Sequence, residues 1–279
     1  MPQLTLPDGR QLEFQDFGPP DARPLLFAHS TPGSGFALQA LERAAAELGL
    51  RLITWSRPGY GTSTRQPERT VAAQAAEVES ILDHLGAPRC LIAGWDGGGP
   101  HALAAAALIP ARIEAALTIS GLAPLAANAY LLRTMHEHRQ EELAAAALGE
   151  TALRNYLSAH VTTALSGIPL TDTDRAALAP PTTADLFHNY QHGLTFGLDG
   201  WVDDDLALTR LWGFDPSRIG VPVHIWHGSD DYQVPYAHSW LLAAAIPTAT
   251  THIEPDHGHL SLMLGHLPAM LAALMQDAR

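Results

Sequence analysis

The sequence predicts an α/β protein: a mostly parallel sheet with helices on both faces. Three observations support this fold class, namely short apolar segments without polar alternation, alanine-rich or amphipathic segments between them, and glycine or proline at their borders. Parallel strands are buried on both faces and are therefore apolar throughout, and their crossovers are usually helices. With 279 residues the chain is long enough for one large α/β domain or two small ones.

Eight strands are expected. A hairpin around the turn at residues 7–9 supplies two, and the other six are the apolar segments 23–29, 51–55, 89–95, 113–120, 221–228 and 249–255. Helical spacing of alanine and leucine predicts helices over 36–48, 71–86 and 98–108, then from near Pro235 and from about Leu260. Gly49 and Gly86 stand where the first two helices should end.

The alternation stops in the middle of the chain. Residues 121–217 carry helical patterns without a convincing strand, and 176–185 is expected to be a loop among them. We therefore predict a core of residues 1–120 and 218–279, with residues 121–217 inserted as a helical cap.

Composition narrows the function classes. The chain has 16 Lys and Arg against 29 Asp and Glu, a formal charge of −13, which argues against nucleic acid or an anionic membrane as partner. No apolar run is long enough for a membrane span, and the N-terminus lacks a secretory pattern, so we expect a soluble cytoplasmic protein. The single cysteine, Cys90, is expected to be buried in a strand. The expected partner is a small-molecule substrate, and the oligomeric state stays open.

The most informative segment is Gly94-Trp95-Asp96-Gly97-Gly98, at the border of a strand and a helix. Residues displayed on such a sharp turn need small neighbours two positions before and after, because larger side chains collide with the adjacent strand and helix. The free N–H groups of the following helix point to the same place and stabilise negative charge. The pattern predicts that Asp96 is displayed for chemistry.

These motifs resemble the α/β-hydrolase fold, in the branch with "HGTPG" and "GWSGGGPHALA" signatures. The first appears as residues 29–33, the second as 94–104, and "SRPGYGTS" at 56–63 matches the loop between them. Two positions depart from the family: Ser30 replaces glycine, and Asp96 replaces the nucleophilic serine. The resemblance implies an oxyanion hole formed by the N–H groups of Thr31 and Gly97.

The resemblance also supplies an acid and a histidine in the family's chain order. "HGSDDYQVP" resembles the acid loop and aligns Asp231 with the acid, with Asp230 as the alternative. "EPDHGHLSL" places His259 at the histidine position, with His257 as the alternative. We predict no metal and no cofactor, since the histidines near these loops are explained by the motifs.

An aspartate changes the chemistry, because a carboxylate attacks saturated carbon rather than carbonyls. The family resemblance implies epoxide hydrolases or haloalkane dehalogenases. Dehalogenases resembling this fold carry a halide-binding tryptophan after the nucleophile, whereas Trp95 precedes Asp96. We therefore expect an epoxide-hydrolase-like enzyme that opens a strained ring, an epoxide or an aziridine, through an alkyl-enzyme ester.

The leaving group of such a reaction needs a proton donor, and epoxide hydrolases use tyrosines of the cap. The residues we consider as pocket or acid candidates are His29, Ser30, Trp95, Tyr130, Tyr156, Tyr190, Trp201 and Trp212. The acids of "GWVDDDLAL" at 200–208 are interpreted as a helix start rather than as metal ligands.

Other functions remain open at this point. Asp tolerates left-handed backbone, so the protein could be a non-catalytic ligand-binding relative with a degenerate elbow. It could also be a serine esterase or lactonase relative whose nucleophile was replaced, either by engineering or for a lyase or cyclase reaction.

Overall fold

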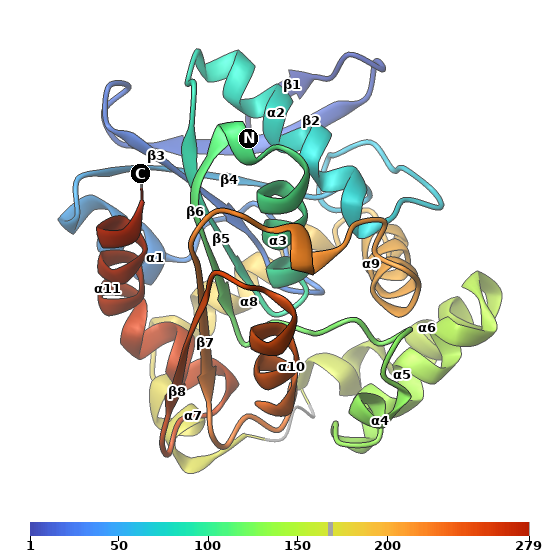
Figure 1. The fold of residues 1–279 in the computed structure, drawn as a ribbon. Coiled ribbons are helices and arrows are strands. Elements are labelled where there is room, and N and C mark those ends of the chain that lie inside the picture. The colour runs from blue at the N-terminus through green and yellow to red at the C-terminus, as the bar shows by residue number, and fades with distance from the viewer. Residues whose placement is uncertain (167–169, 279) are drawn as a thin grey trace.

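The computed structural model describes residues 1–166 and 170–278. Its strands form one sheet of eight, in the order β1-β2-β4-β3-β5-β6-β7-β8 (Figure 1). Pairing is antiparallel at β1–β2 and β2–β4 and parallel at every other neighbouring pair. The strands are β1 Gln3–Thr5, β2 Gln11–Phe17, β3 Arg23–Ala28, β4 Leu50–Trp55, β5 Cys90–Trp95, β6 Ile113–Ile119, β7 Val223–Gly228 and β8 Ala249–Glu254.

Helices cover both faces of this sheet, so the predicted fold class is confirmed. Helices α1 (Gln39–Glu47) and α11 (His259–Asp277) lie on one face (Figure 1). Helices α2 (Gln74–Leu85), α3 (Gly98–Leu108) and α10 (Ala237–Ala245) lie on the other.

Each face of the sheet has its own apolar core. Successive strand residues point to opposite faces, so Leu25 packs in the core beneath α1 and α11 while Leu26 packs in the core beneath α2 and α3. Both leucines are fully buried, and burial of one such side chain contributes about 1.5–3 kcal/mol. Double-sided burial explains why the central strands are apolar without alternation.

Six helices stand between β6 and β7 in the described residues: α4 Ala129–Leu132, α5 Glu137–Leu148, α6 Glu150–Ser166, α7 Asp172–Ala177, α8 Thr182–Gly193 and α9 Asp199–Thr209. Helices α5, α6 and α9 pack on one another, whereas α7 packs against α11 of the sheet layer (Figure 1). We refer to residues 121–217 as the inserted segment. Its separation as a cap from a core of 1–120 and 218–279 stays a prediction.

Some expected element borders were wrong. The first helix begins at Gln39 instead of Phe36, because the backbone before it is held by side chains: Ala37 N donates to Gln15 Oε1, and Phe36 O accepts from Asn189 Nδ2. The loop expected over 176–185 is shorter, since α7 reaches Ala177 and α8 begins at Thr182 after two prolines. Short 3₁₀ turns occupy Val71–Ala73, Pro110–Arg112 and Pro216–Arg218.

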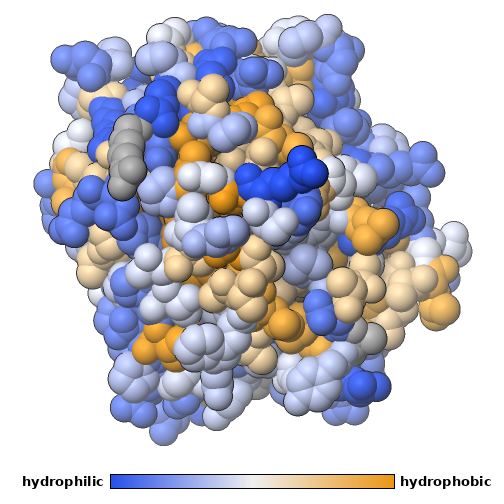
Figure 2. Space-filling view, in the orientation of Figure 1, coloured by the Kyte–Doolittle hydropathy of each residue, from blue (hydrophilic) through white to orange (hydrophobic). Residues whose placement is uncertain are grey.

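On the face of the molecule that Figure 2 shows, hydrophilic residues lie mainly around the rim and hydrophobic residues mainly nearer the centre. Within residues 1–166 and 170–278, no helix has the length and apolar character needed to span a bilayer. Cys90 is buried in β5, and burial raises the pKa of its thiol, so the thiol stays protonated and unreactive at neutral pH.

Candidate active site

Asp96 occupies the turn between β5 and α3. Its φ of +53° is in the left-handed region, which few residues other than glycine adopt. A Cβ on Gly94 would lie 2.1 Å from Gly98 O, and a Cβ on Gly98 would lie 2.2 Å from Ala28 O. The glycines around Asp96 are therefore required by the close approach of strand and helix.

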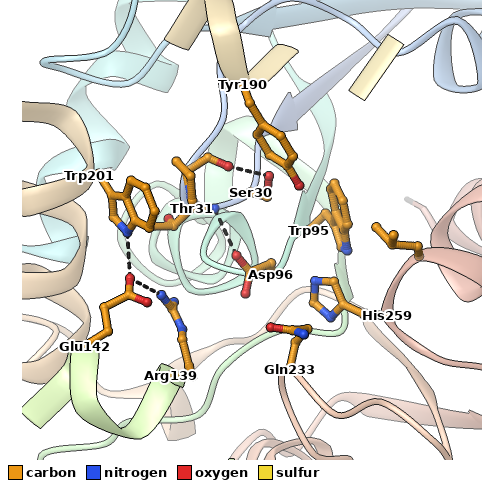
Figure 3. Close-up of a pocket in the computed structure, with 12 residues that line it drawn as sticks. Ser30, Thr31, Trp95, Asp96, Arg139, Glu142, Tyr190, Trp201, Gln233 and His259 are labelled. Atoms are coloured by element: carbon orange, nitrogen blue, oxygen red, sulfur yellow. Dashed lines mark hydrogen bonds and ion pairs between the residues drawn. The ribbon is translucent and has the colours of Figure 1, made fainter. Parts of the chain in front are cut away.

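The two oxygens of the Asp96 carboxylate have different surroundings. Oδ2 accepts a hydrogen bond from Thr31 N at 2.9 Å. Oδ1 has no hydrogen-bond partner among the residues that the structure describes. The side chain is buried, with 6% of the residue exposed, and borders a cavity (Figure 3). Oδ1 is thus the oxygen available to react.

The loop after β7 and the start of α11 bring a second carboxylate to a histidine. Asp231 Oδ2 lies 2.8 Å from His259 Nδ1, and Asp231 Oδ1 accepts from the N–H groups of Gln233 and Val234 at 2.9 Å each. These bonds fix the carboxylate. Asp231 therefore binds His259 through Nδ1 and not through Nε2. The alternatives lie elsewhere: Asp230 accepts from Ser229, and His257 contacts His266.

Charge controls the protonation of this pair. Burial alone would lower the pKa of His259, but the charge and hydrogen bond of Asp231, together with the charges of Asp96 and Asp174, raise it to about 8. Burial opposes ionisation of Asp231, yet the neighbouring His259 and His227 hold the pKa of its carboxyl well below its usual range. At neutral pH the structure therefore favours a charged His259 between two carboxylates.

The cavity beside Asp96 has a volume of about 70 Å³. It is lined by Ser30, Thr31, Pro32, Trp95, Asp96, Arg139, Glu142, Tyr190, Trp201, Gln233, His259 and Leu260 (Figure 3). The nucleophile and histidine candidates thus face one small space, and residues of α5, α8 and α9 close it from the inserted segment.

Of the pocket and acid candidates, Ser30, Trp95, Tyr190 and Trp201 line this cavity. Burial and the charge of Asp96 raise the pKa of the Tyr190 hydroxyl, so Tyr190 keeps its proton at neutral pH. Trp201 Nε1 donates to Glu142 Oε1 at 2.6 Å and is already used. Ser30 Oγ donates to Pro32 O at 2.8 Å, and the Ser30 side chain also interacts with the Tyr190 hydroxyl.

The other four candidates do not line the cavity. Tyr130 is 66% exposed. Tyr156 donates its hydroxyl hydrogen bonds to His138 O and Glu141, and Trp212 packs in the core against Phe214. His29 Nε2 accepts from the N–H of Arg57, and burial and the Arg57 charge hold its pKa well below the usual range, so His29 is a neutral structural residue.

Gly97 lies beside Thr31, and the oxyanion hole expected from their N–H groups stays a prediction. A Cβ on Gly97 would come within 2.1 Å of Thr31 Oγ1, so only glycine allows this approach. The described residues contain no group of three or more His, Cys, Asp or Glu side chains arranged to hold a metal ion.

Arg139 and Glu142 line the cavity, although the sequence did not identify them. Both belong to α5, whose buried positions are Arg139, Glu142, Leu143 and Ala146. This spacing marks one face of a helix, and charged residues on the same face as buried leucine and alanine were the available signal.

A buried ionic cluster behind the cavity was also missed. Asp204 of α9 is fully buried and accepts from Arg57 Nη2 and Arg69 Nη2 at 2.6 Å each and from Thr31 Oγ1 at 2.8 Å. The acids at 203–205 are therefore not a helix start, because α9 begins at Asp199. Arg57 Nη2 also donates to Ser30 O, so the cluster holds the loop that presents Thr31 N to Asp96.

A larger cavity of about 500 Å³ lies next to the first and shares Tyr190 and Leu260 with it. Its other lining residues come from α6, from α8 with Leu194 at its end, and from positions 170 and 178 on either side of α7, and they are mostly apolar, including Leu186 and Phe187. The two cavities therefore have one wall in common.

A family model described as alpha/beta hydrolase fold matches residues 23–266. A non-heme chloroperoxidase of Streptomyces lividans is 28% identical over 275 residues, covering 94% of each chain. Bifunctional epoxide hydrolase 2 of Mus musculus is 29% identical over 120 residues, which cover 42% of this chain and 21% of the mouse protein.

Among solved structures, the enol-lactonase of Burkholderia xenovorans superposes with a TM-score of 0.73 at 19% identity, covering 99% of this chain and 100% of the lactonase. At that identity the likeness establishes the fold alone.

Proposed function

The chain belongs to the alpha/beta hydrolase fold family, and we propose that it is a hydrolase that opens a three-membered ring, an epoxide or an aziridine, with Asp96 as nucleophile. One observation carries the proposal: the Asp96 carboxylate, whose Oδ1 has no hydrogen-bond partner in the described residues, stands at the turn where the fold displays its nucleophile and shares a cavity with His259, which is paired with Asp231. The expected substrate is small, as the volume of about 70 Å³ suggests.

The hydrogen bond to Thr31 supports separate roles for the two Asp96 oxygens. Oδ1 attacks the ring carbon in line with the breaking bond and becomes the ester oxygen. Oδ2 stays on Thr31 N and becomes the carbonyl oxygen of that ester. The electron pair of the breaking bond goes to the ring heteroatom, and Tyr190, protonated in the same cavity, supplies the proton.

Hydrolysis of the ester regenerates Asp96. His259 Nε2 takes a proton from a water molecule as that water attacks Cγ of Asp96, and the negative charge that develops on Oδ2 is held by Thr31 N and Gly97 N. The Cγ–Oδ1 bond then breaks, and the product leaves with Oδ1 and the proton that His259 returns to it. Ester formation removes the charge of Asp96, which is one of the causes of the raised pKa of His259. Loss of that charge lowers the pKa of the imidazole, so His259 releases its proton to solvent more readily at the step that needs a base.

The partial similarity to a mouse epoxide hydrolase supports this assignment, and the full-length similarity to a chloroperoxidase is consistent with other hydrolase-family chemistry. The nucleophile itself rests on the geometry of Asp96.

A single turnover in ¹⁸O-labelled water tests the ester. Water attacks Cγ, so one labelled oxygen should remain in the peptide that contains Asp96, measured by mass spectrometry. If label enters only the product during the first turnover, Asp96 is not alkylated.

His259→Ala tests the second step. Without the base, alkylation should proceed and hydrolysis should stop, so the intact protein should gain the mass of the substrate. Normal turnover by this variant would exclude His259 as the base. Asp96→Asn, which lacks the nucleophile, is the matched control and should gain no mass.

A replaced serine nucleophile is the second candidate, favoured by the Thr31 and Gly97 donors, which suit acyl transfer as well. Asp96→Ser should then hydrolyse p-nitrophenyl acetate through the Asp231–His259 pair, while the native chain shows no ring opening. Ring opening by the native chain excludes this candidate.

A further inference from the structure

Arg139 lines the cavity and is a buried cation with one donor that has no partner in the described residues. Its residue is 9% exposed, and Nη1 donates to Glu142 Oε1 at 2.6 Å and to Asp205 Oδ1 at 3.4 Å. Nη2 is buried without a hydrogen-bond partner within the described part of the chain. Figure 3 shows Arg139 extending beside Glu142 toward Asp96. A buried N–H without an acceptor is costly, so its acceptor is expected to arrive with a ligand.

We propose that Arg139 is a catalytic residue whose Nη2 holds the leaving heteroatom of the ring as negative charge develops on it. The inference rests on the proposed function. In an in-line displacement the leaving atom lies on the side of the carbon away from the attacking oxygen. That side of Asp96 is closed by the inserted segment, which supplies Arg139 and Tyr190 to the same cavity.

The charged residues around the cavity favour a neutral substrate, on which negative charge develops only during the reaction, over a substrate that is already an anion. The carboxylates of Asp96 and Glu142 are balanced by the cations Arg139 and His259, so a substrate carboxylate would add a net negative charge before any reaction. Ring opening adds none, because the charge leaves Asp96 Oδ1 as it arrives on the heteroatom. A preorganised donor aimed at the place where charge develops stabilises the transition state more than the ground state.

Arg139 and Tyr190 would have different roles: Arg139 binds the leaving atom, and Tyr190 donates the proton. Burial disfavours the charged guanidinium, but the charges of Glu142, Asp205 and Asp96 raise its pKa further above the usual range, so Arg139 does not release a proton. The Asp96 Oδ1–carbon bond forms, the carbon–heteroatom bond breaks with its electron pair on the heteroatom, and Arg139 Nη2–H binds that atom. Tyr190 donates the proton and regains one from water.

Two reagents of similar size separate this role from a structural one. In the His259→Ala background, alkylation of Asp96 is followed by intact mass with 1,2-epoxypropane, which expels an alkoxide, and with 1-bromopropane, which expels weakly basic bromide. Arg139→Met should slow alkylation by the epoxide about 100-fold or more, the effect of losing one oxyanion donor. Alkylation by the bromide should change by no more than a few-fold.

Arg139→Lys keeps the positive charge beside Glu142 and guards against misfolding of the methionine variant. It should slow the epoxide reaction less than methionine does, with the bromide reaction unchanged. Arg133→Met, an exposed arginine of the same inserted segment, is the matched control and should alter neither rate.

The outcomes are distinct. A parent His259→Ala protein that gains no mass from either reagent overturns the proposed function and this inference with it. Alkylation of the parent by both reagents, with equal slowing of both by the lysine variant, leaves the proposed function standing and overturns the role of Arg139.

Guanidinium ion should restore the epoxide reaction in Arg139→Ala, where the shorter side chain leaves space for the ion, and not in Arg139→Met. Equal behaviour of the two variants would contradict the assignment.

Discussion

His259 shows how one residue can change its role within a catalytic cycle. In the free protein its ring lies between two acids and carries a proton, and its Nδ1 is fixed by Asp231 at 2.8 Å. Trp95 packs against the ring, with centroids 5.3 Å apart, and limits its rotation. Asp231 contributes most to the raised pKa of His259, and the charge of Asp96 is the contribution that ester formation removes.

Asp96→Asn reproduces the neutral state of the ester without the substrate. Removing one negative charge beside an imidazolium disfavours the protonated form, so the pKa of His259 should fall below about 8. An NMR titration of the His259 ring measures it directly. The native protein should hold the proton up to about pH 8, and the variant should lose it at lower pH. An unchanged titration would show that Asp96 does not set the charge of His259.

At the scale of elements, the N-terminus of α11 carries His259 and is capped from the inserted segment. Asp174 Oδ1 accepts from Leu260 N at 3.1 Å and from Ser261 N and Ser261 Oγ at 2.8 Å each. A Cβ on Gly258 would lie 2.2 Å from Asp174 Oδ2, so glycine is needed for the carboxylate to reach the helix. This contact joins α7 to the helix that bears the proposed base.

Asp174→Ala should destabilise the protein by about 1–3 kcal/mol, because two buried N–H groups and a hydroxyl lose their acceptor. Urea unfolding measures the loss, and hydrolysis of the Asp96 ester should slow with it as His259 loses its support. Asp172→Ala is the control, since the Asp172 side chain is fully exposed on the same helix and should have no measurable effect. Equal stability of the two variants would contradict the capping role.

Elements and motifs differ in how far the sequence predicts them. The buried strands follow from their apolar composition, and the Asp96 turn follows from glycines that the backbone contacts require. The pairing of Asp231 with His259 was expected from the family motifs. Tyr190 could not be distinguished from Tyr130 or Tyr156 in advance, because the packing of distant helices decides which of them reaches the cavity. Arg139 and Asp204 depend on the same tertiary contacts.

For the whole molecule, the inserted segment is fastened to the sheet layers at several points. Asn189 of α8 donates to Ser34 O and Phe36 O, Asp174 caps α11, and Asp204 of α9 binds Arg57 and Arg69. These contacts are buried, except that between Asn189 and Phe36, which is partly buried. The segment above the cavity is therefore expected to unfold together with the sheet in one transition, rather than to separate as an independent unit.

Asp204→Asn tests the strongest of these connections. The change removes the charge opposite Arg57 and Arg69, which stay buried, so stability should fall by about 3–5 kcal/mol, as when one partner of a buried ion pair is removed. Asp203→Asn is the matched control one residue earlier: Asp203 pairs with Arg65, which is 26% exposed, so a smaller loss is expected. Urea unfolding followed by tryptophan fluorescence and by circular dichroism compares the stabilities of the two variants.

Because Asp204 also holds Thr31 and Arg57, Asp96 of the Asp204→Asn variant should be alkylated more slowly even where the variant is fully folded. Equal losses in the two variants, or a fluorescence transition separate from that of circular dichroism, would show that Asp204 does not bind the inserted segment to the sheet.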